Sequence, residues 1–155
     1  MSAVLQTQPA LRLMMPADLD AVMGIEKDIY EFPWTLGNFC DSLAAGYSCW
    51  IFSHSHGSEI IGYAVVIHAA GEAHLLNLSI AARWQRKGYG GRLLEQLMVV
   101  MCDHGATQLF LEVRLSNIAA QQLYLRHGFA QIGLRRNYYP ARHGREDASV
   151  LSRTL

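Results

Sequence analysis

The sequence has no excess of charge of either sign. Its 155 residues include 13 basic and 13 acidic side chains, which gives a formal net charge of zero. A neutral chain has no global electrostatic field that would draw it to nucleic acid or to anionic lipid. We therefore expect no direct nucleic-acid partner, and any anion-binding site must be local.

Long apolar runs are missing as well. The longest nearly apolar stretch covers residues 60–70, which is far shorter than the roughly 20 residues of a membrane-spanning helix. Residues 1–10 have neither the basic start nor the apolar core of a signal peptide. We expect a soluble, cytoplasmic protein with no membrane association.

Cysteine is scarce. Cys40, Cys49 and Cys102 form an odd, widely spaced set without a CxxC pair, which indicates neither a disulfide framework nor a zinc site. We expect reduced and partly buried thiols. His54 and His56 would share one face of a strand, but no third ligand is near, so a polar hairpin turn is favoured over a metal site. We expect no bound metal.

What the chain does contain is typical of a globular protein. Hydrophobic residues make up 51% of it and charged residues 17%, a balance that favours a filled interior over disorder. No internal repeat, low-complexity segment or linker divides it, and its length matches one ordinary domain. We expect residues 1–10 to form a flexible tail and residues 11–155 to form a single domain.

Periodicity and turn-forming residues predict the order of the first elements. A short strand over residues 11–14 precedes a helix that begins at Pro16, and Thr35 can cap a second helix. Three β-rich runs then predict an antiparallel meander. These runs cover residues 47–53, 60–68 and 73–81.

The second half of the chain alternates helices and strands. Apolar residues at helical spacing predict a helix over residues 90–104, and a strand follows over residues 108–113. Asn117 is positioned to cap a short helix. Residues 129–134 and 148–155 are expected to form two closing strands. This order predicts an α/β protein with a mixed sheet and helices on its faces.

The segment most suggestive of chemistry is residues 85–91, Gln-Arg-Lys-Gly-Tyr-Gly-Gly, between a predicted strand and the start of a helix. Glycines let the backbone turn its N–H groups inward, and a helix N-terminus adds partial positive charge. The densest basic cluster of the chain lies here: Arg83, Arg86, Lys87 and Arg92. The pattern favours a pyrophosphate site over a glycine-rich turn with solvated charges.

Two common nucleotide-binding motifs do not fit this segment. A Walker A loop needs Gly-Lys followed by Ser or Thr, whereas Lys87 precedes Gly88 and no hydroxyl follows at the required place. A Rossmann fingerprint needs three glycines in GxGxxG spacing, and Gly88 and Gly90 have no third at the right offset. The phosphate site must belong to another class.

The spacing Gln85-x-x-Gly88-x-Gly90 at a strand-to-helix junction resembles the acetyl-CoA pyrophosphate loop of the GNAT superfamily. More narrowly, the chain is similar to the RimI group of ribosomal-protein alanine N-acetyltransferases from residue 11 onward. The segments that carry this likeness are residues 32–34, 76–80, 85–91, 111–117, 123–124 with 128–129, 135–140 and 144–148.

The resemblance implies a fold and a cofactor site. The fold is the GNAT fold, a central, mixed and mostly antiparallel twisted sheet of about seven strands with about four helices on its faces. Acetyl-CoA is the implied co-substrate, and Leu78, Ser79 and Ile80 would hold its pantetheine arm through backbone groups. The other implied cofactor-binding residues are Arg86, Lys87, Gly88, Tyr89, Gly90, Gly91 and Asn117.

Acetyl transfer to an amine needs a base and an acid, because the amine must lose a proton and the departing thiolate must gain one. Glu112 lies in an otherwise apolar strand, where spacing alone indicates a charge on an open sheet face or an ion pair with Arg114. Tyr124 falls on an apolar helix stripe, where periodicity alone indicates a core residue. The resemblance implies that Glu112 is the general base, acting through water, and that Tyr124 is the general acid.

The implied acceptor is the N-terminal alanine of a small-subunit ribosomal protein, with residues 135–140 forming part of the wall around its N-terminal peptide. Two alternatives stay open from the residues alone. One is an enzyme of the same fold that acetylates lysine side chains or a small-molecule amine. The other is a non-catalytic acyl-CoA-binding module, which would keep the glycine loop but could lose Glu112 or Tyr124 without harm.

Overall fold

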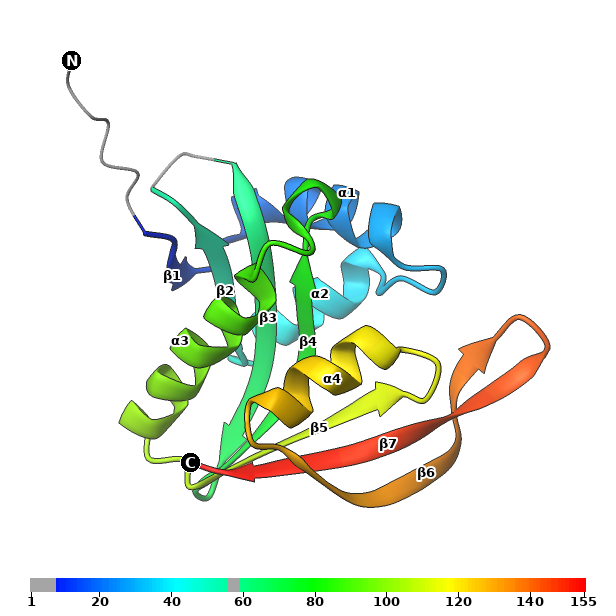
Figure 1. Ribbon diagram of the computed structural model, residues 1–155. Coiled ribbons are helices and arrows are strands. Elements are labelled where there is room, and N and C mark those ends of the chain that lie inside the picture. The colour runs from blue at the N-terminus through cyan, green and yellow to red at the C-terminus, as the bar shows by residue number, and fades with distance from the viewer. Residues whose placement is uncertain (1–7, 56–58) are drawn as a thin grey trace.

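The computed structural model describes residues 8–55 and 59–155 (Figure 1). The strands are β1 Ala10–Leu13, β2 Ser48–Ser53, β3 Ile60–Ala69, β4 Glu72–Ile80, β5 Gln108–Arg114, β6 Ala130–Ala141 and β7 Gly144–Thr154. The α-helices are α1 Leu19–Ile29, α2 Leu36–Ala44, α3 Tyr89–Asp103 and α4 Ile118–Arg126. None of the helices in these two ranges has the length and apolar character needed to cross a membrane.

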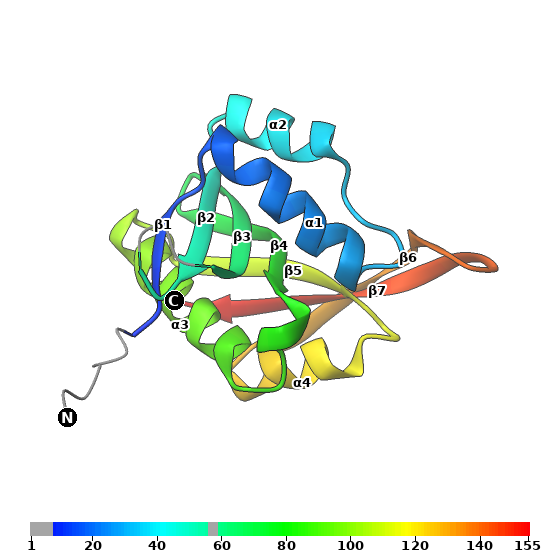
Figure 2. The same cartoon turned by 90° about the horizontal axis from the view of Figure 1, so that it is seen from above.

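One sheet organises the molecule. Its seven strands lie in the order β1-β2-β3-β4-β5-β7-β6, and β2, β3 and β4 form the predicted antiparallel meander. Seen from above, α1 and α2 cover one face of the sheet, and α3 and α4 cover the other (Figure 2). The predicted mixed sheet with helices on its faces is confirmed.

Local sequence explains where two of the helices begin. The N–H of Asn38 donates to Thr35 Oγ1 at 3.1 Å and the N–H of Thr35 donates to Asn38 Oδ1 at 2.9 Å, which closes a capping box on α2. Asn117 Oδ1 accepts from the N–H of Ala120 at 3.1 Å and caps α4. Both predicted caps are confirmed, and the second sets the start of α4 beside the end of β5.

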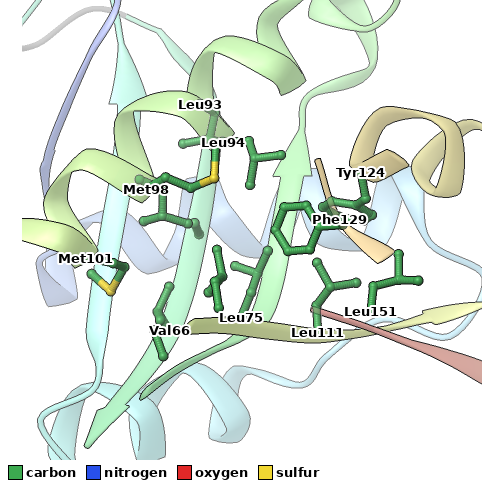
Figure 3. Packing of buried hydrophobic residues seen from close by; sticks show 14 of the residues in the cluster. Val66, Leu75, Leu93, Leu94, Met98, Met101, Leu111, Tyr124, Phe129 and Leu151 are labelled. Carbon is green, nitrogen blue, oxygen red and sulfur yellow. The ribbon is translucent and has the colours of Figure 1, made fainter. Parts of the chain in front are cut away.

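The core lies in two layers, one on each face of the sheet. One layer lies between the sheet and α3 and α4 (Figure 3). The buried residues of α3 in it are Leu93, Leu94, Leu97, Met98 and Met101. On the other face, Val22, Phe39 and Tyr63 pack between the sheet and the first two helices. The central strands are therefore buried on both sides, so polar side chains there need partners.

The last two strands are longer than the sequence predicts. The prediction places them over residues 129–134 and 148–155, whereas β6 and β7 extend into a common hairpin. β6 is an edge strand, so most of its side chains are exposed and lack the alternation that marks a half-buried strand. Residues 135–140 are part of β6, with a register shift between Arg135 and Tyr139.

Two smaller expectations have different outcomes. The turn predicted around His56 lies outside the described residues. All three cysteines are free thiols, and Cys49 is buried. Cys40 and Cys102 are exposed because they lie on α2 and α3 at positions outside the buried stripes, so the expected partial burial is wrong for these two.

β4 and β5 are parallel neighbours in the middle of the sheet, and they separate along their length. Their pairing runs from Glu72 with Gln108 to Leu75 with Leu111 and ends there. Residues 76–80 of β4 therefore leave β5, and the sheet opens toward the C-terminal ends of both strands. Open α/β sheets commonly bind their ligands at this end.

Candidate active site

A cavity of about 380 Å³ lies where β4 and β5 separate. A cavity at the lower end of the size range of small-molecule pockets can take the end of a ligand and an attacking group together. Its walls come from α1, the loop after α1, β4, β5, α4 and β6. The polar or aromatic residues that line it include Glu26, Tyr30, Trp34, Asn77, Glu112, Asn117, Tyr124 and Tyr139.

Glu112 is held in this cavity by two basic side chains. Its side chain is 7% exposed, and its carboxylate oxygens lie 2.5 Å from His74 Nε2 and 3.1 Å from Arg135 Nε. Burial by itself raises the pKa of Glu112, but the hydrogen bond and charge of His74 and the charge of Arg135 outweigh it, so the pKa falls below its ordinary value. Glu112 is therefore ionised at neutral pH.

Strand register explains these partners. His74 on β4 pairs with Phe110 on β5, and side chains two apart on a strand share a face, so Glu112 lies on the same face as Phe110 and within reach of His74. Arg114 instead pairs with Glu146, at 3.3 Å. The ion pair of Glu112 with Arg114 that spacing suggested is therefore wrong, and sequence reasoning missed both actual partners because neither is a chain neighbour.

Tyr124 belongs to the core and to the cavity at once. It is 7% exposed, packs edge-on against Phe129 with ring centroids 5.5 Å apart, and lines the cavity from α4. Burial, with smaller contributions from Tyr30 and Tyr139, raises the pKa of Tyr124 well above its ordinary value. The phenol keeps its proton throughout the physiological pH range.

A buried carboxylate on α1 forms part of the opposite wall. Glu26 is 1% exposed and accepts hydrogen bonds from three neutral donors. These are the hydroxyl of Tyr63 at 2.9 Å, the amide of Asn77 at 3.0 Å and the backbone N–H of Trp34 at 3.2 Å. The carboxylate thus ties α1 to β3, to β4 and to the loop after α1.

The same network continues along β4. Ser79 Oγ donates to Asn77 Oδ1 at 2.6 Å and lies 2.6 Å from the hydroxyl of Tyr30. Burial raises the pKa of Tyr30 to about 12, with the charge of Glu26 adding to the effect and the hydrogen bond of Ser79 opposing it. Only backbone roles were predicted for Ser79, so its side-chain role is new, and the α1 residues of the network gave no signal in the sequence.

The glycine-rich loop joins the end of β4 to α3. Gly88 has a φ of +84° at the N-cap of α3, a left-handed conformation that glycine adopts without strain. A Cβ on Gly91 would lie 3.1 Å from Cε1 of His127, so this glycine lets α3 approach α4 closely. Arg86 and Lys87 are exposed beside the loop. The first turn of α3 leaves backbone N–H groups without helical partners, as every helix does.

The far end of β4 links this loop to the cavity. Gln85 Nε2 donates to the carbonyl of Ile80 at 2.9 Å, which fixes the loop to the strand. The carbonyl of Leu78 accepts a longer hydrogen bond from the hydroxyl of Tyr30, at 3.4 Å. Since β5 has left β4 at this level, the edge of β4 between loop and cavity can accept an extended ligand.

Arg114 brings two walls of the cavity together. Its guanidinium lies 4.4 Å from the ring centroid of Tyr139 and 5.3 Å from that of Phe32, and it donates to the carbonyl of Pro140 at 2.7 Å. The loop after α1 and the β6–β7 hairpin therefore meet over one cation.

Within the described residues, no group of three His, Cys, Asp or Glu side chains is placed to hold a metal ion.

Comparison with known proteins agrees with this geometry. The Acetyltransferase (GNAT) family model matches residues 19–129. The [ribosomal protein bS18]-alanine N-acetyltransferase of Escherichia coli strain K12 is 36% identical over 135 residues, which cover 87% of this chain and 90% of the relative. A Bacillus subtilis relative, named as a putative enzyme of the same kind, is 30% identical over 152 residues. The match covers 97% of this chain and 99% of the relative.

Solved structures give the same result. The crystal structure of the ribosomal-protein-S18-alanine N-acetyltransferase from Escherichia coli has a TM-score of 0.87 and 33% identity, and the match covers 96% of this chain and 94% of that one. Ard1 from Thermoplasma volcanium shares the fold, with a TM-score of 0.85 at 21% identity. The glycine-rich loop, the separated strands and the extensive match to these relatives lead to one conclusion: the chain belongs to the GNAT family of acetyltransferases.

Proposed function

We propose that the protein transfers the acetyl group of acetyl-CoA to the α-amine of the N-terminal alanine of ribosomal protein bS18. The observation that carries this proposal is the cavity between β4 and β5, where an ionised Glu112 and a protonated Tyr124 line one space. The curated relatives named for this reaction cover most of the chain. A ribosomal-protein acceptor would place the reaction in the cytoplasm.

The residues present fit acetyl-CoA. The loop at Gly88 offers the amides of the first turn of α3 and the exposed cations Arg86 and Lys87, which suit a pyrophosphate. The unpaired edge of β4 at residues 78–80 leads from the loop to the cavity and suits an extended arm. When bound, acetyl-CoA supplies the thioester that the amine attacks.

We assign the proton transfers to the two cavity residues. Glu112, through a water molecule, accepts the proton that the α-ammonium must lose before its nitrogen can attack the thioester carbon. A C–N bond forms, the C–S bond breaks, and Tyr124 gives its proton to the departing sulfur. The second proton, which the nitrogen loses as it becomes an amide, returns to the Tyr124 phenolate and restores the phenol. The raised pKa of Tyr124 keeps that proton available, and the lowered pKa of Glu112 keeps the carboxylate free to accept one.

We infer that the acceptor peptide leaves the cavity between the loop after α1 and the β6–β7 hairpin. Phe32 and Tyr139, both stacked on Arg114, form the two sides of this path. Asn117 lines the cavity, and its helix cap uses only the amide oxygen. We propose that the rest of its amide contacts the co-substrate.

Mass spectrometry after incubation with acetyl-CoA and two peptides tests this proposal. One peptide has the N-terminal sequence of bS18 with a free alanine, and the other is blocked at its N-terminus and carries internal lysines. We expect one acetyl group on the first peptide and none on the second. Acetylation of the blocked peptide alone would indicate a lysine acetyltransferase, and no transfer to either would contradict the proposal.

A further inference from the structure

Glu26 is a buried carboxyl group without a basic partner in the part of the chain that the structure describes. Its side chain is 1% exposed, and among residues 8–55 and 59–155 no lysine, arginine or histidine forms an ion pair with it. Buried carboxylates are expensive, and those that persist in proteins are normally paired with a cation or a metal. The arrangement around Glu26 therefore calls for an explanation.

The groups that face Glu26 carry no positive charge. They are the hydroxyl of Tyr63 from β3, the amide of Asn77 from β4, the backbone N–H of Trp34 and, one step further, the hydroxyl of Tyr30. All are neutral hydrogen-bonding groups. Burial and the charge of Glu26 raise the pKa of Tyr63, so this hydroxyl stays protonated and keeps donating.

The opposite wall of the cavity differs in this respect. Glu112 already forms ion pairs with two basic side chains, His74 and Arg135, whereas Glu26 forms none among residues 8–55 and 59–155. Both carboxylates line the same cavity. Of the two, Glu26 is the one whose carboxyl group forms no ion pair among the described residues and can take a cationic ligand as its partner.

We propose that the carboxylate of Glu26 binds the positively charged α-ammonium of the acceptor before that group loses its proton. The inference rests on the proposed function, because it takes the acceptor to be a protein N-terminus. A free N-terminus carries its charge below a pKa of about 8 and so arrives as a cation. The acceptor thus brings a counter-ion that none of the described residues supplies.

This role separates Glu26 from the catalytic pair. Holding the ammonium stabilises the bound ground state and makes proton loss no easier, so the charge contributes to acceptor affinity and not to the chemical step. Loss of the charge should raise KM for the peptide and leave kcat at least as high as before. Loss of a catalytic base or acid would instead lower kcat and leave KM for the peptide nearly unchanged.

Calorimetry with a matched pair of peptides tests the proposal on the CoA-bound protein. One peptide begins with alanine, and the other has a propionyl group in its place, which keeps every atom except the amine. At pH 6.5 the wild type should bind the alanine peptide about tenfold more tightly, at the lower end of measured couplings between close charges. At pH 9.5, where the amine is neutral, this preference should fade.

Four variants separate the charge of Glu26 from the packing around it. Glu26→Gln keeps the shape of the side chain and should abolish the preference at pH 6.5, whereas Glu26→Asp should retain part of it. Tyr63→Phe removes a hydrogen bond but no charge and should keep the preference. Glu72→Gln, on the exposed start of β4, neutralises a distant carboxylate and should change nothing.

Two results would overturn the inference. One is a wild-type protein that binds the alanine and propionyl peptides equally at pH 6.5. The other is a folded Glu26→Gln variant that keeps the full preference. Neither touches the proposed function, which fails instead if the wild type transfers no acetyl group to the alanine peptide.

Discussion

The two ends of the site are built in different ways. At the cofactor end, the loop over residues 85–91 and the edge of β4 are consecutive in the chain and offer mainly backbone groups and exposed cations. At the acceptor end, side chains from α1, β4, β5, α4 and β6 meet in one cavity, and its two carboxyl groups, Glu26 and Glu112, are held by side chains from other elements.

This difference suggests a division of labour. A backbone site depends on local conformation, so it tolerates changes in side chains far from the loop. A side-chain site depends on the register of strands and on shared partners, so one substitution there affects a proton transfer directly. We expect variants of Glu112 and Tyr124 to lower kcat and variants at the cofactor end to lower cofactor affinity.

The largest expected effect is that of Tyr124→Phe. The phenylalanine keeps the packing against Phe129 but cannot protonate the departing sulfur, so kcat should fall about 1000-fold, within the range known for general acids. Steady-state kinetics with the alanine peptide measure this change. A loss of less than about threefold would remove Tyr124 from the mechanism and leave it a core residue.

Glu112→Gln should have the next largest effect. The glutamine is isosteric but cannot accept a proton from the bridging water, and we expect kcat to fall about 100-fold. Glu146→Gln is the matched control, because it also breaks a carboxylate pair with an arginine, Arg114, but does not line the cavity. Equal losses of kcat in both variants would mean that the broken ion pairs, and not the loss of a base, lower the rate.

A substitution at the cofactor end should have a smaller effect, and the effect should be on the affinity for CoA. Valine at Gly88 must adopt a φ of +84°, which costs about 1–2 kcal/mol and shifts the loop amides, so affinity for CoA should fall about tenfold. Gly105→Val imposes a similar strain, at a φ of +88°, beyond the other end of α3. If both variants lose the same affinity for CoA, general destabilisation explains the effect.

Much of the cofactor end could be predicted from the sequence, because its information is local. The turn residues and the apolar spacing of α3 placed the glycine loop at a helix start, and the positive φ of Gly88 agrees with that prediction. The sequence did not show that Gly91 also allows close packing of α3 against His127 at the end of α4. That contact depends on how two helices pack, and no local pattern encodes it.

The acceptor end was largely hidden for the same reason. Glu112 is 38 residues from His74, and Glu26 is 51 residues from Asn77, so each pair exists only once strands and helix are in place. Glu112 itself was visible as an acidic residue in an apolar strand. The ion pair with Arg114 that spacing suggested was wrong, because spacing along one strand cannot show which side chains the neighbouring strands place beside Glu112.

The smallest expected effect concerns stability and pH. The pKa of Glu112 is lowered in the folded chain, so its stabilising contribution is complete above its ordinary value of 4.5 and is lost as pH falls through the lower folded value. Urea unfolding of wild type and Glu112→Gln between pH 7 and pH 3 should show a shallower acid decline for the variant. Parallel declines would mean that His74 and Arg135 do not stabilise the carboxylate.

The most direct test of the division between the two ends is calorimetric titration of CoA into the wild type and three variants: Tyr124→Phe, Glu112→Gln and Gly88→Val. We expect dissociation constants within about threefold of wild type for the first two variants and about tenfold weaker binding for the third. Loss of CoA affinity in the first two, equal to that of the third, would contradict the account and would make Tyr124 and Glu112 structural.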